Sequence, residues 1–173
     1  MDGFTLRHLA LAVALSSSMG TAFAATSNDF VDNAAAGGIA EVETSKLAVE
    51  KSSSADIKSF ANMMITDHTK ANDELAALAK KHDIEVPDST TLVKQAKEKI
   101  LDLRDESFDA AYANNQVKAH EETIALFKKE ADTVTDDKTP GGAELKGFAQ
   151  QMLPALQKHL EAAKALQAAH PSK

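Results

Sequence analysis

The sequence predicts an all-α protein, an antiparallel four-helix bundle whose third helix is long or bent. Apolar residues recur at the three- and four-residue spacing of an amphipathic helix through four long segments. The 173 residues include only 7 glycines and 4 prolines, aromatic residues make up 5%, and no segment alternates apolar and polar residues as a strand does. Four amphipathic helices joined by short links bury their apolar faces by packing around one core.

The first 24 residues are predicted to be a signal peptide and not part of the fold. A short polar start precedes an apolar run at 9–15, and the small-x-small tripeptide at 22–24 predicts cleavage before Ala25. The apolar run is too short to span a membrane. We therefore expect a bacterial protein that is periplasmic or secreted, with residues 25–28 as a short leader.

Charge and motif content narrow the classes of function. The net charge of -7 argues against nonspecific nucleic-acid binding, which needs a basic surface. The absence of cysteine excludes disulfides, thiolate metal sites and cysteine nucleophiles. No phosphate loop, Rossmann glycine pattern, G-x-S-x-G or H-E-x-x-H motif occurs, so hydrolase and nucleotide chemistry have no support. No partner can be named from the sequence, and a homo-oligomer is compatible with it.

The first helix is predicted over residues 29–51, with Asn28 or Asp29 as its N-cap. Its inner face consists of small residues and carries Glu41 near the centre. Two glycines at 37–38 each cost roughly 1 kcal/mol in a helix interior relative to alanine. Either a neighbouring helix approaches closely at this point, beside Glu41, or the glycines provide local flexibility.

The second helix is predicted over residues 55–82, after a turn of three serines at 52–54. His68 lies inside the apolar stripe of this helix, and Asp67 lies at the edge of the stripe. His82 falls at the helix end, where we expect it to be solvated, as we do for His170 at the end of the chain.

The third helical region covers residues 91–131, as one long helix or as two with a bend between them. Its apolar stripe includes three polar residues, Asp109, Gln116 and His120. Tyr112 shares this inner face, where it packs in the core or donates a hydrogen bond to Asp109. Each buried polar group needs a partner, because an unsatisfied one costs on the order of 1–3 kcal/mol.

The fourth helix is predicted over residues 143–169, after a polar, turn-forming segment at 132–142. His159 lies near the middle of its apolar face, and Pro154 lies inside the helix, where proline removes one backbone hydrogen bond. The bundle domain is thus expected to cover 29–169, with residues 170–173 as a tail.

Each predicted helix contributes one charged or imidazole group to the core. Glu41 and His68 differ in depth by only ~6 Å when counted from the turn that joins their helices. His120 and His159 differ by ~9 Å on the same basis. A single site shared by the four helices is therefore allowed by the spacing.

Imidazole and carboxylate groups in a bundle core are ligands for transition metals such as iron, zinc or copper. The predicted ligands are Glu41, His68, Asp109, His120 and His159. Asp67, Tyr112 and Gln116 are expected to support them from behind. In the alternative interpretation, the two acids neutralise the imidazoles as a buried polar network without metal.

Four separated motifs carry a family resemblance. They are G-G-I-A-E-V-E at 37–43, F-A-N-M-M-I-T-D-H at 60–68, F-D-A-A-Y at 108–112 and L-P-A-L-Q-K-H-L at 153–160. Over residues 29–168 the chain resembles the exported ferritin-like proteins of domain-of-unknown-function family 4142. The resemblance implies a ferritin-like bundle and bacterial export, and some relatives carry an outer-membrane or periplasmic label. The family's motif positions would fall on Glu41, Asp67, His68, Asp109, Tyr112, His120 and His159.

The chain departs from the ferritins in one respect. Carboxylate-bridged di-iron bundles place a glutamate three residues before a histidine on two helices. Here Ile65, Val117 and Leu156 occupy that position before the three core histidines. Ferroxidase and oxygenase activities are therefore not expected, and a mononuclear or histidine-rich site fits the sequence better.

Three functions follow from this reading. The first is a periplasmic bundle that binds, buffers or senses a transition metal without catalysis. The second is a structural or stress-related interaction protein with a buried histidine–carboxylate network. The third is a small redox enzyme with an open metal position, which needs a site that a substrate can reach.

Overall fold

The computed structural model describes residues 26–88, 90, 93, 108–135 and 139–172. Over these residues the chain forms four long α-helices and no strand, which confirms the predicted all-α class. The helices are α1 (Asp29–Lys51), α2 (Ala55–Lys81), α4 (Phe108–Ala131) and α5 (Gly142–Ala169). The predicted signal peptide at 1–24 and the question of a bend before residue 108 concern residues outside those described.

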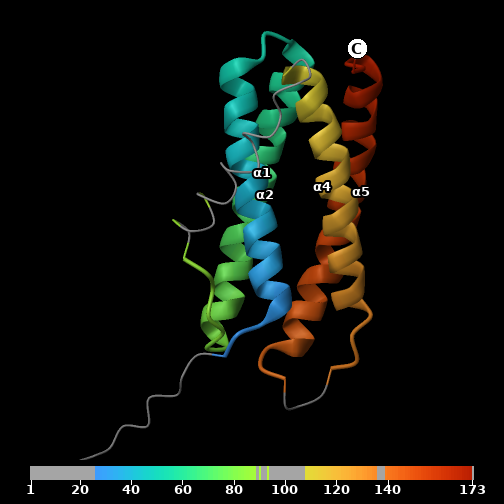
Figure 1. Cartoon of the computed structure of the whole chain (residues 1–173). Coiled ribbons are helices and arrows are strands. Elements are labelled where there is room, and N and C mark those ends of the chain that lie inside the picture. Colours follow the sequence, from blue (N-terminus) through green and yellow to red (C-terminus); the bar gives the residue numbers. More distant parts are fainter. Residues whose placement is uncertain (1–25, 89, 91–92, 94–107, 136–138, 173) are drawn as a thin grey trace, which may run out of the picture.

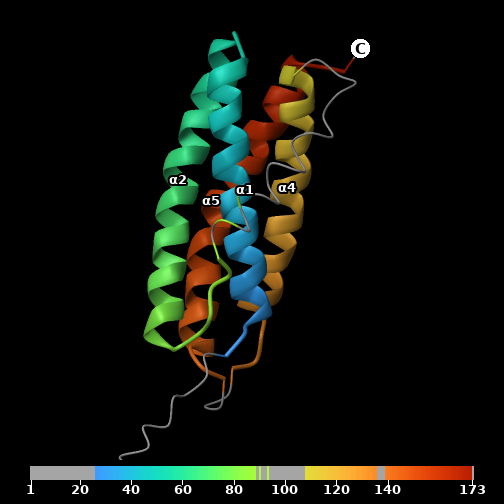
Figure 2. The same ribbon diagram turned by 60° about the vertical axis from the view of Figure 1, so that its left-hand side comes forward.

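The four helices pack pairwise and antiparallel (Figure 1). One hairpin consists of α1 and α2, and the other consists of α4 and α5. The hairpins meet where α1 packs on α4 and α2 packs on α5 (Figure 2). Each helix therefore runs antiparallel to both of its neighbours, as predicted for the bundle. None of the helices in the described ranges is long and apolar enough to cross a membrane.

The helix ends follow from local chemistry. The side chain of Asn28 accepts a hydrogen bond from the backbone N–H of Val31 at 3.0 Å, which makes Asn28 the N-cap of α1. Gly141 precedes α5 with φ of 67°, a left-handed conformation that glycine adopts without steric cost. Because these signals are local, the predicted bounds of α1, α2 and α5 lie within one residue of those observed.

Close approach explains one of the two adjacent glycines. A Cβ atom at Gly38 would overlap the side-chain amide of Asn72 on α2, so this amide can lie against α1 only because residue 38 has no side chain. A Cβ atom at Gly37 would meet Thr123 at an ordinary contact distance of 3.9 Å. The predicted close approach is therefore correct at Gly38.

The core contains two apolar clusters. The cluster near the start of α1 includes Phe30, Leu75, Phe127, Leu145 and Phe148. The cluster near the other end includes Ile57, Phe60, Met64, Tyr112 and Leu166.

A polar layer lies between the two apolar clusters. On every helix, a buried polar residue stands between the residues of one cluster and those of the other. These buried polar residues are Glu41, His68, His120 and His159. The polar layer is thus placed in the middle of the bundle.

Candidate metal centre

Three histidines from three helices converge in the polar layer. His68 of α2, His120 of α4 and His159 of α5 are buried, with at most 7% of any residue exposed. Their ring centroids form a nearly equilateral triangle with sides of 5.6, 5.6 and 5.5 Å. One ring nitrogen of each lies within 4.8 Å of a ring nitrogen of the other two. Three of the five predicted ligands therefore meet at one point.

Hydrogen bonds hold two of the rings from behind. The Nδ1–H group of His120 donates to the backbone carbonyl of Gln116 at 2.9 Å. The Nε2–H group of His159 donates to a carboxylate oxygen of Asp67 at 3.0 Å. Since a neutral imidazole carries one proton, each of these bonds leaves a lone pair on the opposite nitrogen.

The remaining nitrogens have no partner. Among the described residues, nothing accepts from or donates to Nε2 of His68, Nε2 of His120 or Nδ1 of His159. Buried nitrogens without hydrogen bonds are rare in folded proteins and each requires an explanation. Each of the three converging rings thus carries one nitrogen that is free to act as a donor to a metal.

The electrostatics of the site favour the ligating form of the rings. Burial and, to a smaller extent, the neighbouring His120 and His159 rings lower the pKa of His68 to about 3. Burial also lowers the pKa of His120 to about 4, against the opposing effect of its hydrogen bond to Gln116. Both rings are therefore neutral at pH 7, and only a neutral imidazole can coordinate a metal.

The donor set fits a transition metal. Zinc–imidazole bonds of about 2.0–2.1 Å place the nitrogens of a three-histidine site roughly 3.3–3.5 Å apart. A small inward movement of rings whose nitrogens lie within 4.8 Å reaches that spacing. Three imidazoles also leave at least one coordination position open for a further ligand.

Glu41 lies in the polar layer but outside the group of three histidines. Burial raises the pKa of Glu41 to about 7, and the nearby Gln116 amide partly opposes this rise. Their contact falls short of hydrogen-bond geometry: Oε2 of Glu41 and both amide atoms of Gln116 have no partner in the described part of the chain. Glu41 is thus a buried acid whose ionisation is disfavoured by its surroundings.

Asp109 stands apart from the histidines. It is half-buried in the first turn of α4 and precedes His120 by 11 residues, about 16 Å along the helix axis. Tyr112 does not bond to Asp109 as one reading predicted, because its hydroxyl pairs with that of Ser45 at 2.9 Å. Ser45 follows Glu41 by four residues on the predicted inner face of α1, but its hydrogen bond to Tyr112 was not predicted.

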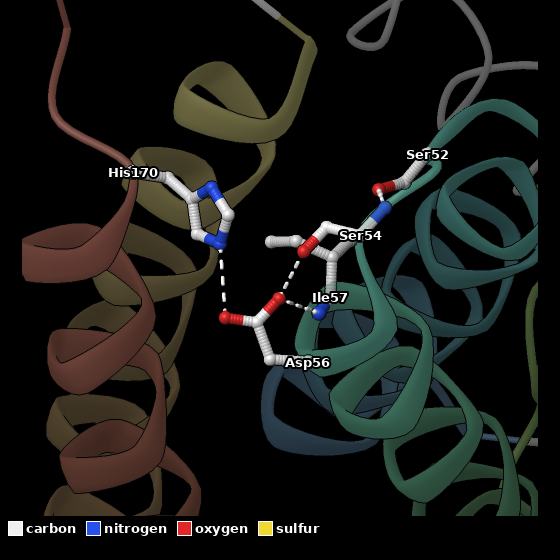
Figure 3. A network of polar contacts seen from close by, with 5 residues as sticks. All are labelled: Ser52, Ser54, Asp56, Ile57 and His170. Atoms are coloured by element: carbon white, nitrogen blue, oxygen red, sulfur yellow. Dashed lines mark hydrogen bonds and ion pairs between the residues drawn. The ribbon is translucent and has the colours of Figure 1, made fainter.

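Two further histidines lie at helix ends, where both are partly exposed and contact carboxylates. Nε2 of His82 lies 3.3 Å from Glu144, and Nε2 of His170 lies 3.0 Å from Asp56. Figure 3 shows the second pair, which joins the end of α5 to the start of α2. Asp56 also accepts hydrogen bonds from the hydroxyl of Ser54 and the backbone N–H of Ile57.

Comparison with known proteins gives one match. Residues 12–166 match the model of a family described as "Domain of unknown function (DUF4142)", which confirms the resemblance drawn from the four motifs. No curated protein and no solved structure matches the chain.

Proposed function

We propose, from the premise that this chain belongs to the DUF4142 family of unknown function, that it binds one transition-metal ion through His68, His120 and His159. One observation carries the proposal: three buried histidine rings converge until one ring nitrogen of each lies within 4.8 Å of the others, and each ring has a buried nitrogen without a hydrogen-bond partner in the described residues. A metal ion at that point would satisfy all three lone pairs at once.

A buried polar network without metal does not explain why three ring nitrogens lack hydrogen-bond partners. Such a network is stable because its polar atoms bond to one another, and each unsatisfied atom costs about 1–3 kcal/mol. Here the carboxylate of Asp67 and the carbonyl of Gln116 bond to the outer nitrogens of two rings and leave the inner ones free. Metal-binding histidines are oriented by the same kind of outer hydrogen bonds.

The ligands indicate the class of metal and the role. Neutral imidazoles favour Zn²⁺, Cu²⁺, Ni²⁺, Co²⁺ or Fe²⁺ over Mg²⁺ and Ca²⁺, which prefer oxygen. Glu41, in the same polar layer, supplies negative charge when the ion drives its ionisation, whereas Asp109 lies too far along α4 to be a ligand in this proposal. The role that we assign is to bind or buffer the ion in the periplasm, after removal of the predicted signal peptide.

The test is the metal content of protein purified without an affinity tag. After equilibration with Zn²⁺ and desalting, mass spectrometry should find one equivalent in the parent protein. The variant His68→Ala/His159→Ala should retain none, and the control His170→Ala should retain one equivalent because His170 is far from the site. A substoichiometric metal content in the parent protein would falsify the proposal.

A structural protein with a histidine–carboxylate network is the second candidate function, and the pairing of His159 with Asp67 is the observation that favours it. The melting temperature distinguishes metal binding from a structural network. A ligand that binds only the folded state at 100 times its Kd stabilises that state by about 2.7 kcal/mol. A chelator should therefore lower the melting temperature of the zinc-loaded protein, whereas an unchanged value supports the network.

A further inference from the structure

A cavity of about 30 Å³ lies in the core beside the three histidines. Its lining includes His68 itself and residues one turn away from each of the three histidines. Ala71 follows His68 by three residues, Thr123 follows His120 by three, and Leu156 precedes His159 by three. Three residues of helix correspond to about 4.5 Å, so the cavity adjoins the layer of the histidines.

The lining of the cavity is mostly apolar. Leu75, Phe127 and Phe148 form much of its wall, and polar atoms come from His68, Asn72 and Thr123. None of the lining residues is an acid, a lysine or an arginine. The lining itself offers no opposite charge to a charged molecule that loses its hydration here, so the lining favours a small uncharged molecule.

The other side of the histidine layer is filled. Met64 precedes His68 by four residues, Gln116 precedes His120 by four, and both are fully buried. An ion held by the three rings is therefore screened on that side by packed side chains. His68 is both a ligand of the proposed ion and a part of the cavity wall, so a further ligand would reach the ion from the cavity.

We propose that the cavity admits an uncharged diatomic molecule of the class of dioxygen or nitric oxide, which coordinates the open position of the metal. This inference rests on the proposed function, because the metal supplies the bond. The volume of about 30 Å³ accommodates one such molecule. Binding is a reversible coordination in which no covalent bond of the protein forms or breaks.

The first test concerns the cavity without metal. Xenon binds in apolar protein cavities and perturbs the NMR signals of the groups around it. In the metal-free full chain, xenon should shift the methyl signals of Leu75 and Leu156. The shift should disappear in Ala71→Leu, which fills the cavity, and persist in Ala76→Leu, which adds the same side chain at an exposed position of α2. The absence of a xenon shift in the parent protein would overturn the inference.

The second test uses nitric oxide and the iron(II)-loaded protein without oxygen. Electron paramagnetic resonance should detect an iron–nitrosyl signal, and Ala71→Leu should weaken nitric oxide binding at least tenfold at unchanged iron content. Ala34→Leu fills the same cavity from α1, which carries no histidine ligand, and should act alike if Ala71→Leu does not fold.

The outcomes of the two tests separate this inference from the proposed function. Equal nitric oxide affinity in the filled variants and the Ala76→Leu control overturns the diatomic site and leaves metal binding intact. A protein that binds zinc but neither iron nor nitric oxide likewise overturns the diatomic site and leaves metal binding intact. A protein that binds neither zinc nor iron overturns both proposals.

Discussion

The buried polar layer and the cluster at the helix ends both contain imidazole and carboxylate groups, but the hydrogen bonding of these groups differs between the two regions. At the helix ends, His170 bonds to Asp56, and the second oxygen of Asp56 accepts from Ser54 and Ile57 (Figure 3). In the layer, three ring nitrogens and one carboxylate oxygen of Glu41 lack a partner among the described residues. His170 is thus paired with a carboxylate, whereas each of the three core histidines has a buried ring nitrogen without a partner among the described residues.

The two carboxyl groups show the same contrast in their pKa values. Hydrogen bonds from Ser54, His170 and Ile57 lower the pKa of Asp56 to about 2. Burial without an adequate partner raises the pKa of Glu41 to about 7. The exposed Asp56 is stabilised as an anion. The buried Glu41 has no positive charge beside it in the described part of the protein.

The largest expected effect is the loss of a ligand. His120→Ala removes one of three nitrogens and should weaken zinc binding by more than the ~10–100-fold that loss of a supporting group typically costs. His170→Ala should leave the affinity unchanged, because that imidazole is already paired at the surface. Competition against a chromophoric chelator measures both. Equal losses of zinc affinity in the two variants would contradict the assignment of the ligands to the buried layer.

A smaller effect is expected from the group behind a ligand. Asp67→Asn keeps an oxygen that can accept from His159 but removes the negative charge, and it should weaken zinc binding by about 10–100-fold. Asp73→Asn, an equal charge change at an exposed position on α2, serves as the control. If both variants bind zinc like the parent, Asp67 does not orient a ligand.

The pH dependence of stability separates the two carboxyl groups. The pKa of Glu41 in the folded state, about 7, lies above its ordinary value of 4.5, so folding takes up a proton between these pH values. The resulting stabilisation is present at low pH and is lost as the pH rises through 7. Glu41→Gln cannot ionise, so its stability relative to the metal-free parent should increase from pH 5 to pH 8 by on the order of 2–3 kcal/mol. Urea denaturation at both pH values measures this, and a constant difference would contradict the buried-acid account.

The smallest effect is expected at the helix ends. His170→Ala should lower the free energy of unfolding by less than about 1 kcal/mol at pH 7, because an exposed ion pair contributes little. The pKa of Asp56 lies below its ordinary value of 3.8, so its stabilising contribution is present above that pH and is lost as the pH falls towards 2. Denaturation with and without Zn²⁺ should give the same difference in the free energy of unfolding between the parent and His170→Ala. A difference that depends on zinc would connect this cluster to the metal.

Local sequence signals were sufficient for the helices and for the face on which each histidine lies. The serine turn at 52–54 and the cap at Asn28 define α1 and the start of α2. Periodicity placed His68, His120 and His159 on inner faces, where the structure also has them. Both kinds of signal depend on residues a few positions apart, which a single sequence displays.

Contacts between helices could not be predicted in the same way, because they depend on the register of one helix against the next. The ~9 Å offset expected between His120 and His159 assumed that the helix ends lie level. In the structure, the side chain of Gln150 donates a hydrogen bond to the carbonyl of Ala131 at the end of α4. Gln150 lies in the third turn of α5. This register brings His159 level with His120, and no periodicity reveals it.

The most direct test of the account is an anomalous difference map from crystals of the tag-free protein grown with one equivalent of Zn²⁺. The account predicts one peak inside the triangle of rings, about 2.0–2.1 Å from Nε2 of His68, Nε2 of His120 and Nδ1 of His159. A peak only at the surface, between His170 and Asp56 or between His82 and Glu144, or no ordered zinc at all, would contradict it.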